Sequence, residues 1–530
     1  MAALTIEEIP RFWRTISHLQ PSQLGWRLKY LVERRLETQA WYRYPVGMLA
    51  RRDLPRLELS RPHFRTRRNL VPPPIDRLSE LSVHRLTLLN EQRKFAGGND
   101  WRLLGEGSRH RLWDFSLHYH AWLKDLALSY ACTRRSAYLT ELRRWLIDWL
   151  THCGCDAPGF SRFAWNSFNI GERLAQWREI DQLIPDSFWQ DSQLPRSRFL
   201  QSISQQADYL SRHIEWDLRG NHLFKDAVGL AAAADLLKGA APPQWAALAA
   251  NITAGQIQEQ LLPDGVHFER SPMYHLHVMQ DLLTLSETIP DVRTLELIRD
   301  ACQRMAEPLR WLKHPCGRFP LFNDSADCGL RPARLESQLI QAGILSDAPS
   351  PAGFRYFDCA GILAWQGKPW TVFWDVGDVG PTYQPGHAHA DTLTVEMSFG
   401  GVPLVVDPGV VCYDQDDRRR YDRSTAAHNT VVIDDTDSSE VWHIFRVGRR
   451  AQPKDVSFTH LDTGFIGHAS HTGYDHLPGA PCHSRRLRCE HDQLLEICDE
   501  VTGLGWHRVA GGFLLAPEWK AESVPGGWIL

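Results

Sequence analysis

QAGILSDAPSPAG, residues 341–353, is a run of small residues and prolines that separates two parts of the chain with different hydrophobic periods. Before it, from about residue 112, apolar residues recur at intervals of three and four, as in LRRWLIDWL at 142–150, which is typical of helices. After about residue 350 the period becomes two, in short β-branched runs such as TVFWDVG at 371–377. The sequence therefore predicts a helical domain over residues 1–345 and a β-sheet domain over residues 346–530.

The helical part contains many consecutive helix-length segments, and the connections between them hold Gly, Pro, Asp and Asn. Such an array forms either an open solenoid or a closed (α/α) toroid. No repeat at the ~34- or ~40-residue period of common helical solenoids is visible, which favours the toroid. In the second part, strands follow strands without intervening helices, which predicts antiparallel pairing in two packed sheets.

Length and charge limit the classes of function. The chain has 530 residues, 43% of them apolar, and a formal net charge of −4. The length predicts two or three domains, and the near-neutral charge argues against nucleic-acid binding, which needs a basic surface. Short basic clusters such as Arg418-Arg419-Arg420 are interpreted as solvated faces. The 21 Trp residues fit a glycan cleft, although most are expected to pack in the core.

The N-terminus lacks a basic segment followed by an apolar run, and no stretch approaches the ~20 apolar residues of a membrane span. We therefore expect a soluble, cytoplasmic chain with no membrane span. The periplasm is the alternative, and assembly as a homodimer remains open. The 11 Cys residues are scattered, without the spacing of a disulfide framework, so mostly free buried thiols are expected.

Polar residues gather at two predicted helix starts. The first is Gly220-Asn221-His222, where the simplest interpretation is that Asn221 caps the helix. The second is DGVHFERSPMYH at 264–275, where Ser271 is a predicted N-cap and Pro272 the first helical residue. Helix N-termini favour anions, so the carboxylate of an acidic sugar is a plausible ligand at both helix starts.

The second helix start carries more polar residues than capping requires. Tyr274 is predicted in the first turn of the helix. Glu269, Arg270 and His275 lie around it in the sequence and are candidate substrate contacts.

A third polar segment is GHAHAD at 386–391, which leads into a strand pattern. If the strand already includes this segment, His387 and His389 face the same side. With Asp407 and His428, which flank later strand patterns, His389 makes an acceptable zinc set. A zinc hydrolase that also uses Asp391 is one alternative, but its HxHxDH template fails at Thr392.

Five segments of the chain, in this order, resemble motifs of the heparinase II/III family of polysaccharide lyases, which is related to alginate lyases and heparin lyases. These segments are GNHLF (220–224), DGVHFERSPMYH (264–275), GHAHADTLT (386–394), VVDPG (405–409) and STAAHNTV (424–431). The most similar variants are those encoded near bacterial exopolysaccharide genes. The resemblance implies an incomplete (α/α) toroid followed by an antiparallel β-sandwich, with an acidic polysaccharide as substrate.

The resemblance also implies an activity and residue roles. A carbon–oxygen lyase of this family removes the C5 proton of a uronic acid and expels the 4-O-linked sugar. Asn221 and His222 would neutralise the sugar carboxylate, and Tyr274 would donate a proton to the leaving oxygen. His387 would be a second acid/base residue. The resemblance assigns His389, Asp407 and His428 as ligands of a structural zinc.

Some choices stay open from the sequence. The base is Tyr274 itself for syn elimination, or His222 or His387 for anti elimination. Some family members carry a Glu three residues after the first His, where this chain has Lys225. Besides the zinc hydrolase, a non-catalytic glycan-binding or assembly protein of exopolysaccharide synthesis is the main alternative function.

Overall fold

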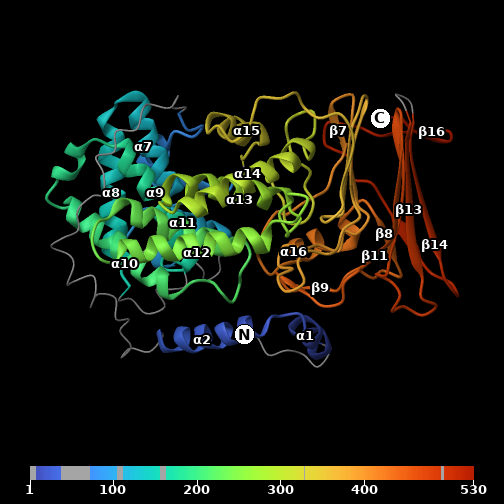
Figure 1. The fold of residues 1–530 in the computed structure, drawn as a ribbon, viewed down its shortest axis with the longest axis horizontal. Helices are drawn as coiled ribbons and strands as arrows, with labels where there is room; N and C mark the ends of the chain where they lie inside the picture. The colour runs from blue at the N-terminus through green and yellow to red at the C-terminus, as the bar shows by residue number, and fades with distance from the viewer. Residues whose placement is uncertain are drawn as a thin grey trace. The chain divides into compact units, whose positions relative to one another are not determined.

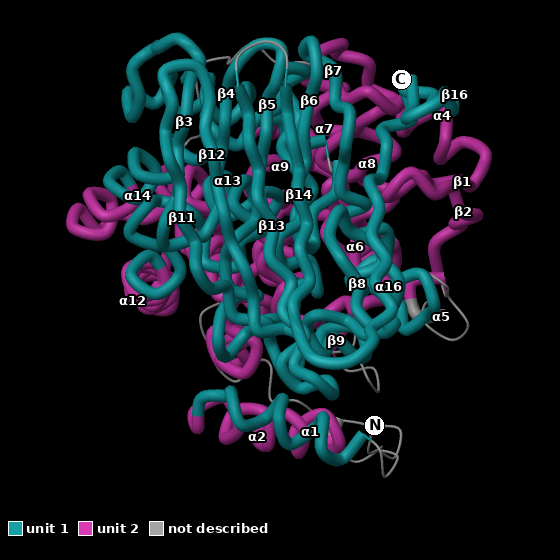
Figure 2. Tube along the Cα trace, turned by 90° about the vertical axis from the view of Figure 1, so that its right-hand side faces the viewer, with its two compact units in different colours: residues 1–20, 257–280, 299–530 teal, residues 21–256, 281–298 magenta. Residues whose placement is uncertain are grey.

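The structure, a computed structural model, describes residues 8–37, 72–98, 100–103, 111–155, 163–327, 329–490 and 494–529 (Figure 1). The chain divides into two compact units (Figure 2). Unit 1 contains residues 1–20, 257–280 and 299–530, and unit 2 contains residues 21–256 and 281–298. The units do not follow the predicted boundary after residue 345, because residues 257–280 and 299–345 group with the strands.

Unit 2 is mainly helical. A short hairpin, β1 (Arg85–Leu88) and β2 (Glu91–Lys94), accompanies the helices. The helices are α2 (Pro21–Glu37), α4 (Arg77–Ser82), α5 (Asp100–Leu103), α6 (Arg111–Tyr119), α7 (Ala121–Thr133), α8 (Ser136–His152), α9 (Ser167–Leu183), η3 (Asp186–Gln190), α10 (Arg196–Arg212), α11 (Asn221–Leu236) and most of α12 (Pro242–Gln260). Two further helices, α13 (Pro272–Thr288) and α14 (Val292–Trp311), contribute residues to both units.

Large aromatic side chains fill the interior of unit 2. Trp122, Trp145 and Trp177 are at most 1% exposed, as expected for core tryptophans. Helices α9 and α11 approach closely where two glycines face each other. A Cβ atom on Gly229 would lie 2.6 Å from the Cα of Gly171, so only glycine permits this crossing.

The larger antiparallel sheets of unit 1 have five and four strands, and three two-stranded sheets accompany them in the described residues. In the five-stranded sheet the neighbours follow chain order, from β3 (Gly353–Phe357) through β4 (Ile362–Gln366), β5 (Trp370–Asp375) and β6 (Val395–Phe399) to β7 (Val402–Val405). The four-stranded sheet has the order β11 (Pro453–Leu461), β12 (Gly464–His471), β13 (Cys482–Glu490) and β14 (Leu494–Thr502). The antiparallel pairing agrees with the sequence-based expectation.

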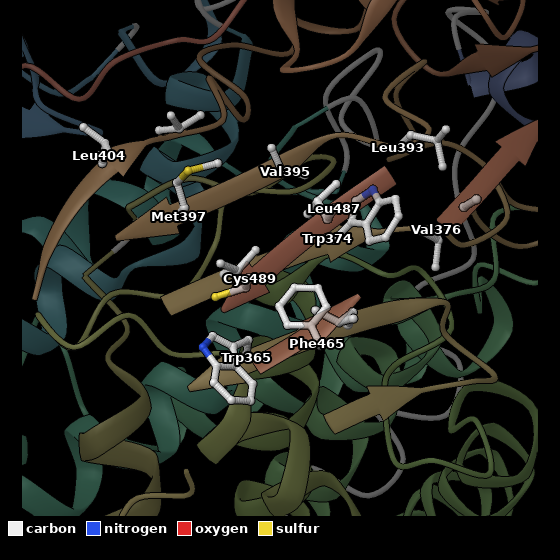
Figure 3. Close-up of a cluster of buried hydrophobic side chains, with 14 residues drawn as sticks. Trp365, Trp374, Val376, Leu393, Val395, Met397, Leu404, Phe465, Leu487 and Cys489 are labelled. Atoms are coloured by element: carbon white, nitrogen blue, oxygen red, sulfur yellow. The ribbon is translucent and has the colours of Figure 1, made fainter. Parts of the chain in front are cut away.

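The two sheets pack face to face through one hydrophobic cluster (Figure 3). Trp365 and Trp374 of the five-stranded sheet meet Phe465 and Leu487 of the four-stranded sheet in this cluster. The opposite face of the five-stranded sheet is covered as well, since Phe373 packs with residues that include Val266 and Phe322. Burial on both faces explains why these strands are continuously apolar rather than strictly alternating.

The remaining elements of unit 1 are short. They are α1 (Glu8–Ile16), α15 (Pro332–Gln341), α16 (Asp417–Asp422), η4 (Thr425–Ala427), β8 (Val431–Ile433), β9 (Val441–Trp442), β10 (Arg446–Val447), β15 (Val509–Gly511), β16 (Glu522–Val524) and β17 (Gly527–Ile529). Among the described helices, none has the length and apolar character needed to cross a membrane.

Candidate active site

The start of α13 is capped as predicted and is tied to a distant loop. The hydroxyl of Ser271 accepts a hydrogen bond from the backbone N–H of Tyr274 at 3.3 Å. The same hydroxyl donates to the backbone carbonyl of Asp324 at 2.9 Å and lies 2.8 Å from the Ser325 hydroxyl. The loop that contains Asp324 and Ser325 therefore fixes the position of Tyr274 in the first turn.

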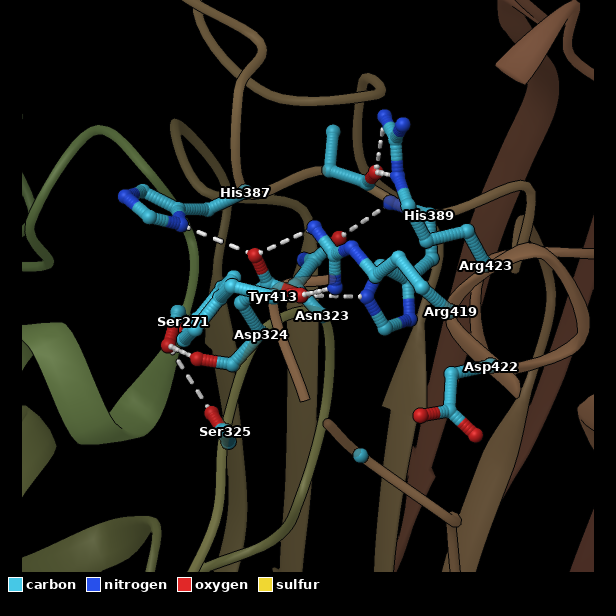
Figure 4. Close-up of polar contacts among 12 residues, drawn as sticks. Ser271, Asn323, Asp324, Ser325, His387, His389, Tyr413, Arg419, Asp422 and Arg423 are labelled. Carbon is cyan, nitrogen blue, oxygen red and sulfur yellow. Dashed lines mark hydrogen bonds and ion pairs between the residues drawn. The ribbon is translucent and has the colours of Figure 1, made fainter. Parts of the chain in front are cut away.

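Asp324 is fully buried at the centre of a polar cluster (Figure 4). Its Oδ2 lies 2.9 Å from Nδ1 of His387, and its Oδ1 lies 2.8 Å from Nε2 of His389. Arg419 contacts both oxygens, with its Nη2 2.8 Å from Oδ2. Burial alone would raise the pKa of Asp324, but Arg419 and the two histidines hold that pKa well below its usual range. Asp324 is therefore an ionised acceptor for both rings.

The strand argument for the two histidines is wrong, because β6 begins only at Val395. His387 and His389 lie in the preceding loop, where side chains do not alternate as in a strand. Two hydrogen bonds to the loop backbone fix the conformation of this loop instead. The Asp324 N–H donates to the His387 carbonyl at 3.0 Å, and the His389 N–H donates to the Asn323 side-chain oxygen at 3.0 Å.

Tyr274 lies beside His387, with 4.0 Å between the ring centroids. Its hydroxyl is 3.1 Å from the hydroxyl of Tyr413. Burial, the neighbouring Tyr413 and the charge of Asp324 raise the pKa of Tyr274 well above its usual value. At neutral pH Tyr274 is thus a phenol that can donate a proton, and a phenolate base is disfavoured.

Two of the three predicted metal ligands, His389 and His428, lie in one buried cluster in which Asp391 takes the place predicted for Asp407. His389, Asp391 and His428 each offer a ligand atom within 4.8 Å of the other two. Within the described part of the chain, three buried side-chain atoms of this cluster have no hydrogen-bond partner: His389 Nδ1, Asp391 Oδ2 and His428 Nε2. Asp407 adjoins the cluster through His428, whose Nδ1 is 2.7 Å from Asp407 Oδ2.

The charges of this cluster fit a divalent cation. Burial, together with the charge of Asp407, raises the pKa of Asp391 to about 6 despite the opposing influence of His428. Burial and the charge of Asp391 raise the pKa of Asp375 well above its usual value. Neighbouring buried carboxylates are costly without a compensating cation. Two imidazoles and a carboxylate are a donor set that zinc accepts, so His389, Asp391 and His428 could hold this ion.

The predicted substrate-binding residues next to Tyr274 differ in their surroundings. Glu269 is 1% exposed, and its Oε2 lies 3.6 Å from Nε2 of His387. The Arg270 guanidinium donates to the Ala360 carbonyl at 2.9 Å and contacts Asp378 at 3.4 Å. Glu269 therefore adjoins the pair of Tyr274 and His387, whereas Arg270 connects the start of α13 to the β-domain segment around Ala360.

His275 has a structural environment. Its Nδ1 accepts a hydrogen bond from the His267 N–H at 3.3 Å, and its Nε2 lies 3.0 Å from the Met305 carbonyl. Burial lowers the pKa of His275 to about 4, against a smaller opposing influence of the Met305 carbonyl. This geometry favours a neutral core histidine over the predicted contact with substrate.

In unit 2, the start of α11 differs from the simple interpretation of Asn221 as a cap. Gly220 is the N-cap, with φ of 60°, and Asn221 is the first residue of the helix. His222 Nδ1 lies 3.0 Å from Glu215 Oε2, which orients the ring. Lys225, at the position where some family members carry Glu, lies 2.7 Å from both Asp281 and Glu172.

Family models match most of the chain. The model described as heparinase II/III N-terminus matches residues 84–335, and the model described as heparinase II/III-like, C-terminal, matches residues 349–527. The chain belongs to the heparinase II/III family. It is 27% identical to a heparin-sulfate lyase of Pedobacter heparinus over 60% of this chain and 52% of that protein. It is 25% identical to one of Bacteroides thetaiotaomicron over 39% of this chain and 31% of that protein.

Solved structures of the heparinase II/III family share the fold. A heparinase III structure has 16% identity, covers 96% of this chain and 81% of its own, and gives a TM-score of 0.68. A heparan sulfate lyase structure from Pedobacter heparinus has 19% identity, covers 89% of this chain and 72% of its own, and gives a TM-score of 0.54. These similarities confirm the predicted fold class, a helical toroid followed by an antiparallel β-domain.

Three residues at the centre of this heparinase II/III site were not identified from the sequence: Asp324, Tyr413 and Arg419. The interpretation of Arg418-Arg419-Arg420 as a solvated face is wrong for its middle residue, whose side chain is 1% exposed. The side chains of Arg418 and Arg420 are 49% and 81% exposed. The available signal was the polar run Asn323-Asp324-Ser325 directly after apolar residues, which looks like an ordinary loop.

Proposed function

We propose that this chain is a polysaccharide lyase that cleaves a uronic-acid-containing glycan by β-elimination. The observation that carries the proposal is the pair of Tyr274 and His387. The phenol and the imidazole lie 4.0 Å apart between ring centroids, in a chain of the heparinase II/III family. Elimination requires a base that removes the C5 proton and an acid that protonates the leaving oxygen, and a phenol beside an imidazole can supply both.

The reaction breaks two bonds in the uronic acid. A base removes the proton from C5, the C5–H electrons form the C4=C5 double bond, and the C4–O4 bond breaks. Tyr274 donates its proton to the departing O4, so the products are a 4,5-unsaturated uronate and a sugar with a new hydroxyl. This assignment follows from the raised pKa of Tyr274, because a phenol can donate without any activation.

We assign the base to His387, one of the three candidates left by the sequence. Its Nδ1–H donates to Asp324, so in the neutral ring Nε2 carries the lone pair that can accept the C5 proton. The resulting imidazolium would be stabilised by the same carboxylate. Tyr274 is less suitable as the base because its pKa is raised by burial.

The sugar carboxylate must be neutralised before C5 becomes acidic, and we assign this role to Asn221 and His222. An amide donor stabilises the negative charge that develops on the carboxylate, and loss of such a donor typically lowers the rate by ~10²–10³. Glu215 Oε2 lies 3.0 Å from Nδ1 of His222 and orients the ring for this role.

We further propose that zinc binds at His389, Asp391 and His428, with Asp407 supporting His428, and that its role is structural. When bound, the ion would tie the loop before β6 to the segment before β8 by coordination. His389 and His428 are at most 4% exposed, which suits a closed structural site better than a site that activates water for hydrolysis.

A substrate screen tests the proposal. The protein is incubated separately with heparan sulfate, heparin, alginate and acidic bacterial exopolysaccharides, and formation of the unsaturated uronate is followed by its ultraviolet absorbance. We expect this chromophore with at least one glycan. Chain cleavage without the chromophore would favour a zinc hydrolase, and glycan binding without cleavage would favour the non-catalytic assembly protein.

A further inference from the structure

The carboxylate of Asp324 is hydrogen-bonded to two histidines, each through a different ring nitrogen. His387 reaches Oδ2 with its Nδ1, and His389 reaches Oδ1 with its Nε2 (Figure 4). An ionised carboxylate can only accept hydrogen bonds, so both rings must donate. This fixes opposite tautomers: neutral His387 carries its lone pair on Nε2, and neutral His389 carries its lone pair on Nδ1.

The two remaining nitrogens serve different purposes. Nδ1 of His389 is one of the buried atoms without a hydrogen-bond partner in the cluster with Asp391 and His428. Nε2 of His387 does not belong to that cluster. It lies 3.6 Å from Glu269 Oε2, and the His387 ring lies beside the ring of Tyr274. Asp324 thus stands between a candidate metal cluster and the candidate acid/base pair.

Asp324 itself is held rigidly. Both terminal nitrogens of Arg419 contact its two oxygens, and Arg419 Nε donates to the Ile444 carbonyl at 3.0 Å. The neighbouring Asn323 accepts the His389 N–H and donates to the Arg270 carbonyl at 3.2 Å. A forked guanidinium on a buried carboxylate leaves little freedom for the carboxylate to rotate.

We propose that Asp324 is a positioning residue shared by His387 and His389, which couples the metal-ligand cluster to the acid/base geometry through one carboxylate. The part that concerns His387 rests on the proposed function, and the part that concerns His389 does not. Carboxylates that hold metal-bound histidines typically change metal affinity or activity by ~10–100-fold when removed.

The test is Asp324→Asn, which keeps the shape of the side chain but replaces one acceptor oxygen by an NH₂ donor. In either orientation of the amide, one ring loses its acceptor, and the other keeps only a neutral amide oxygen in place of a carboxylate oxygen, so both rings are affected. Zinc affinity is measured on the apo-protein by competition with a chromophoric chelator, with zinc ions alone as the probe. We expect the Kd for zinc to rise by ~10–100-fold. We also expect kcat to fall with KM nearly unchanged, because Asp324 does not touch the substrate.

The matched control is Asp422→Asn. Asp422 is also fully buried and is on the same helix as Arg419, but it binds the Val411 N–H at 3.0 Å and Arg418 at 2.7 Å. This variant should keep the wild-type zinc affinity and kcat. If Asp324→Asn does not fold by circular dichroism, Arg419→Lys takes its place. Arg419→Lys retains the Asp324 carboxylate but removes the guanidinium that contacts both of its oxygens. We expect the zinc Kd to rise less in this variant than in Asp324→Asn.

The inference is overturned if Asp324→Asn binds zinc as tightly as the wild type, or if Asp422→Asn loses zinc affinity to the same extent. It is also overturned if the wild-type protein binds no zinc. Coupling predicts in addition that chelation lowers kcat of the wild type by a larger factor than that of Asp324→Asn. If no glycan is cleaved by the wild type, the proposed function fails, while the zinc measurements still decide the role of Asp324 at His389.

Discussion

Helices α11 and α13 start with similar sequence signals but are built differently. In both, the sequence places a polar residue at the expected cap position, Asn221 or Ser271, and further polar side chains directly after it. At α13, Ser271 caps the helix and binds the loop at Asp324, more than fifty residues away. At α11 the cap is Gly220, whose backbone conformation leaves Asn221 as the first helical residue.

The charges around the two starts differ as well. Burial, Tyr413 and the charge of Asp324 raise the pKa of Tyr274 and keep it protonated, whereas Lys225 of α11 is a cation between two carboxylates. The comparison shows that a helix-start pattern fixes where a side chain lies along the helix. The chemistry of that side chain depends on partners from elsewhere in the chain. Substitutions at the two helix starts test this dependence, and those with the greatest expected loss come first.

Tyr274→Phe tests the acid at the start of α13. Removal of the proton donor should lower kcat by ~10²–10⁴ with little change in glycan binding. The rate of unsaturated uronate formation and the glycan Kd are measured together. Tyr474→Phe is the matched control, because it removes a buried tyrosine hydroxyl that donates to the Val431 carbonyl at 2.7 Å. A Tyr274→Phe enzyme that keeps its rate would exclude Tyr274 as the acid.

Asn221→Asp tests the start of α11. It replaces the amide donor by an anion, which repels the sugar carboxylate, so we expect kcat/KM to fall by at least ~10²–10³. Asn169→Asp, in the same unit, removes a hydrogen bond of 2.7 Å to the Phe163 carbonyl and serves as the control for general damage. Equal losses in the two variants, measured per folded molecule, would argue against a role of Asn221 at the substrate.

Lys225→Met tests the cation that replaces the familial Glu. It leaves Asp281 and Glu172 without their charge partner, so the free energy of unfolding should fall by about 3–5 kcal/mol. Urea denaturation measures the change. Lys454→Met removes a half-exposed pair with Asp475 at 3.3 Å and should cost only about 0–1 kcal/mol. Similar losses in both variants would mean that Lys225 is not a buried structural cation.

Ser271→Ala and Gly220→Ala compare the two caps directly. Loss of the Ser271 hydroxyl should cost about 1 kcal/mol of unfolding free energy. Gly220 has φ of 60° and ψ of −150°, a region that is nearly restricted to glycine, so alanine there should cost about 1–3 kcal/mol. Thermal and urea unfolding give both values. A neutral Gly220→Ala would show that the start of α11 does not need this conformation.

His275→Asn distinguishes a core histidine from a substrate contact. The pKa of His275 is lowered from 6.5 to about 4, so between these values the unfolded chain binds a proton that the folded protein does not. The contribution of His275 to stability is therefore present above pH 6.5 and is lost as the pH falls toward about 4. His275→Asn should make the unfolding free energy less dependent on pH in this window and leave kcat of the folded enzyme unchanged. A large loss of kcat would restore the predicted substrate contact.

The sequence predicted the elements around the site better than the contacts within it. The Ser271 cap and the change from helices to antiparallel strands follow from local pattern, whereas the cluster around His389 and His428 contains Asp391 and not the predicted Asp407. Arg419 could not be distinguished from Arg418 and Arg420, because three adjacent arginines have the same composition signal and only packing decides which one is buried.

Hydrophobic period and motif order are local properties of the chain, so the sequence was sufficient to predict the fold class, the family and the place of Tyr274 in the first turn of its helix. The loop that carries His387 and His389, and the hydrogen bonds of both rings to the Asp324 carboxylate, became apparent in the folded chain. These hydrogen bonds join residues more than sixty positions apart through a loop without regular structure. No local periodicity encodes such a contact, because it requires the buried Asp324 carboxylate to pair with Arg419, which is distant in the sequence.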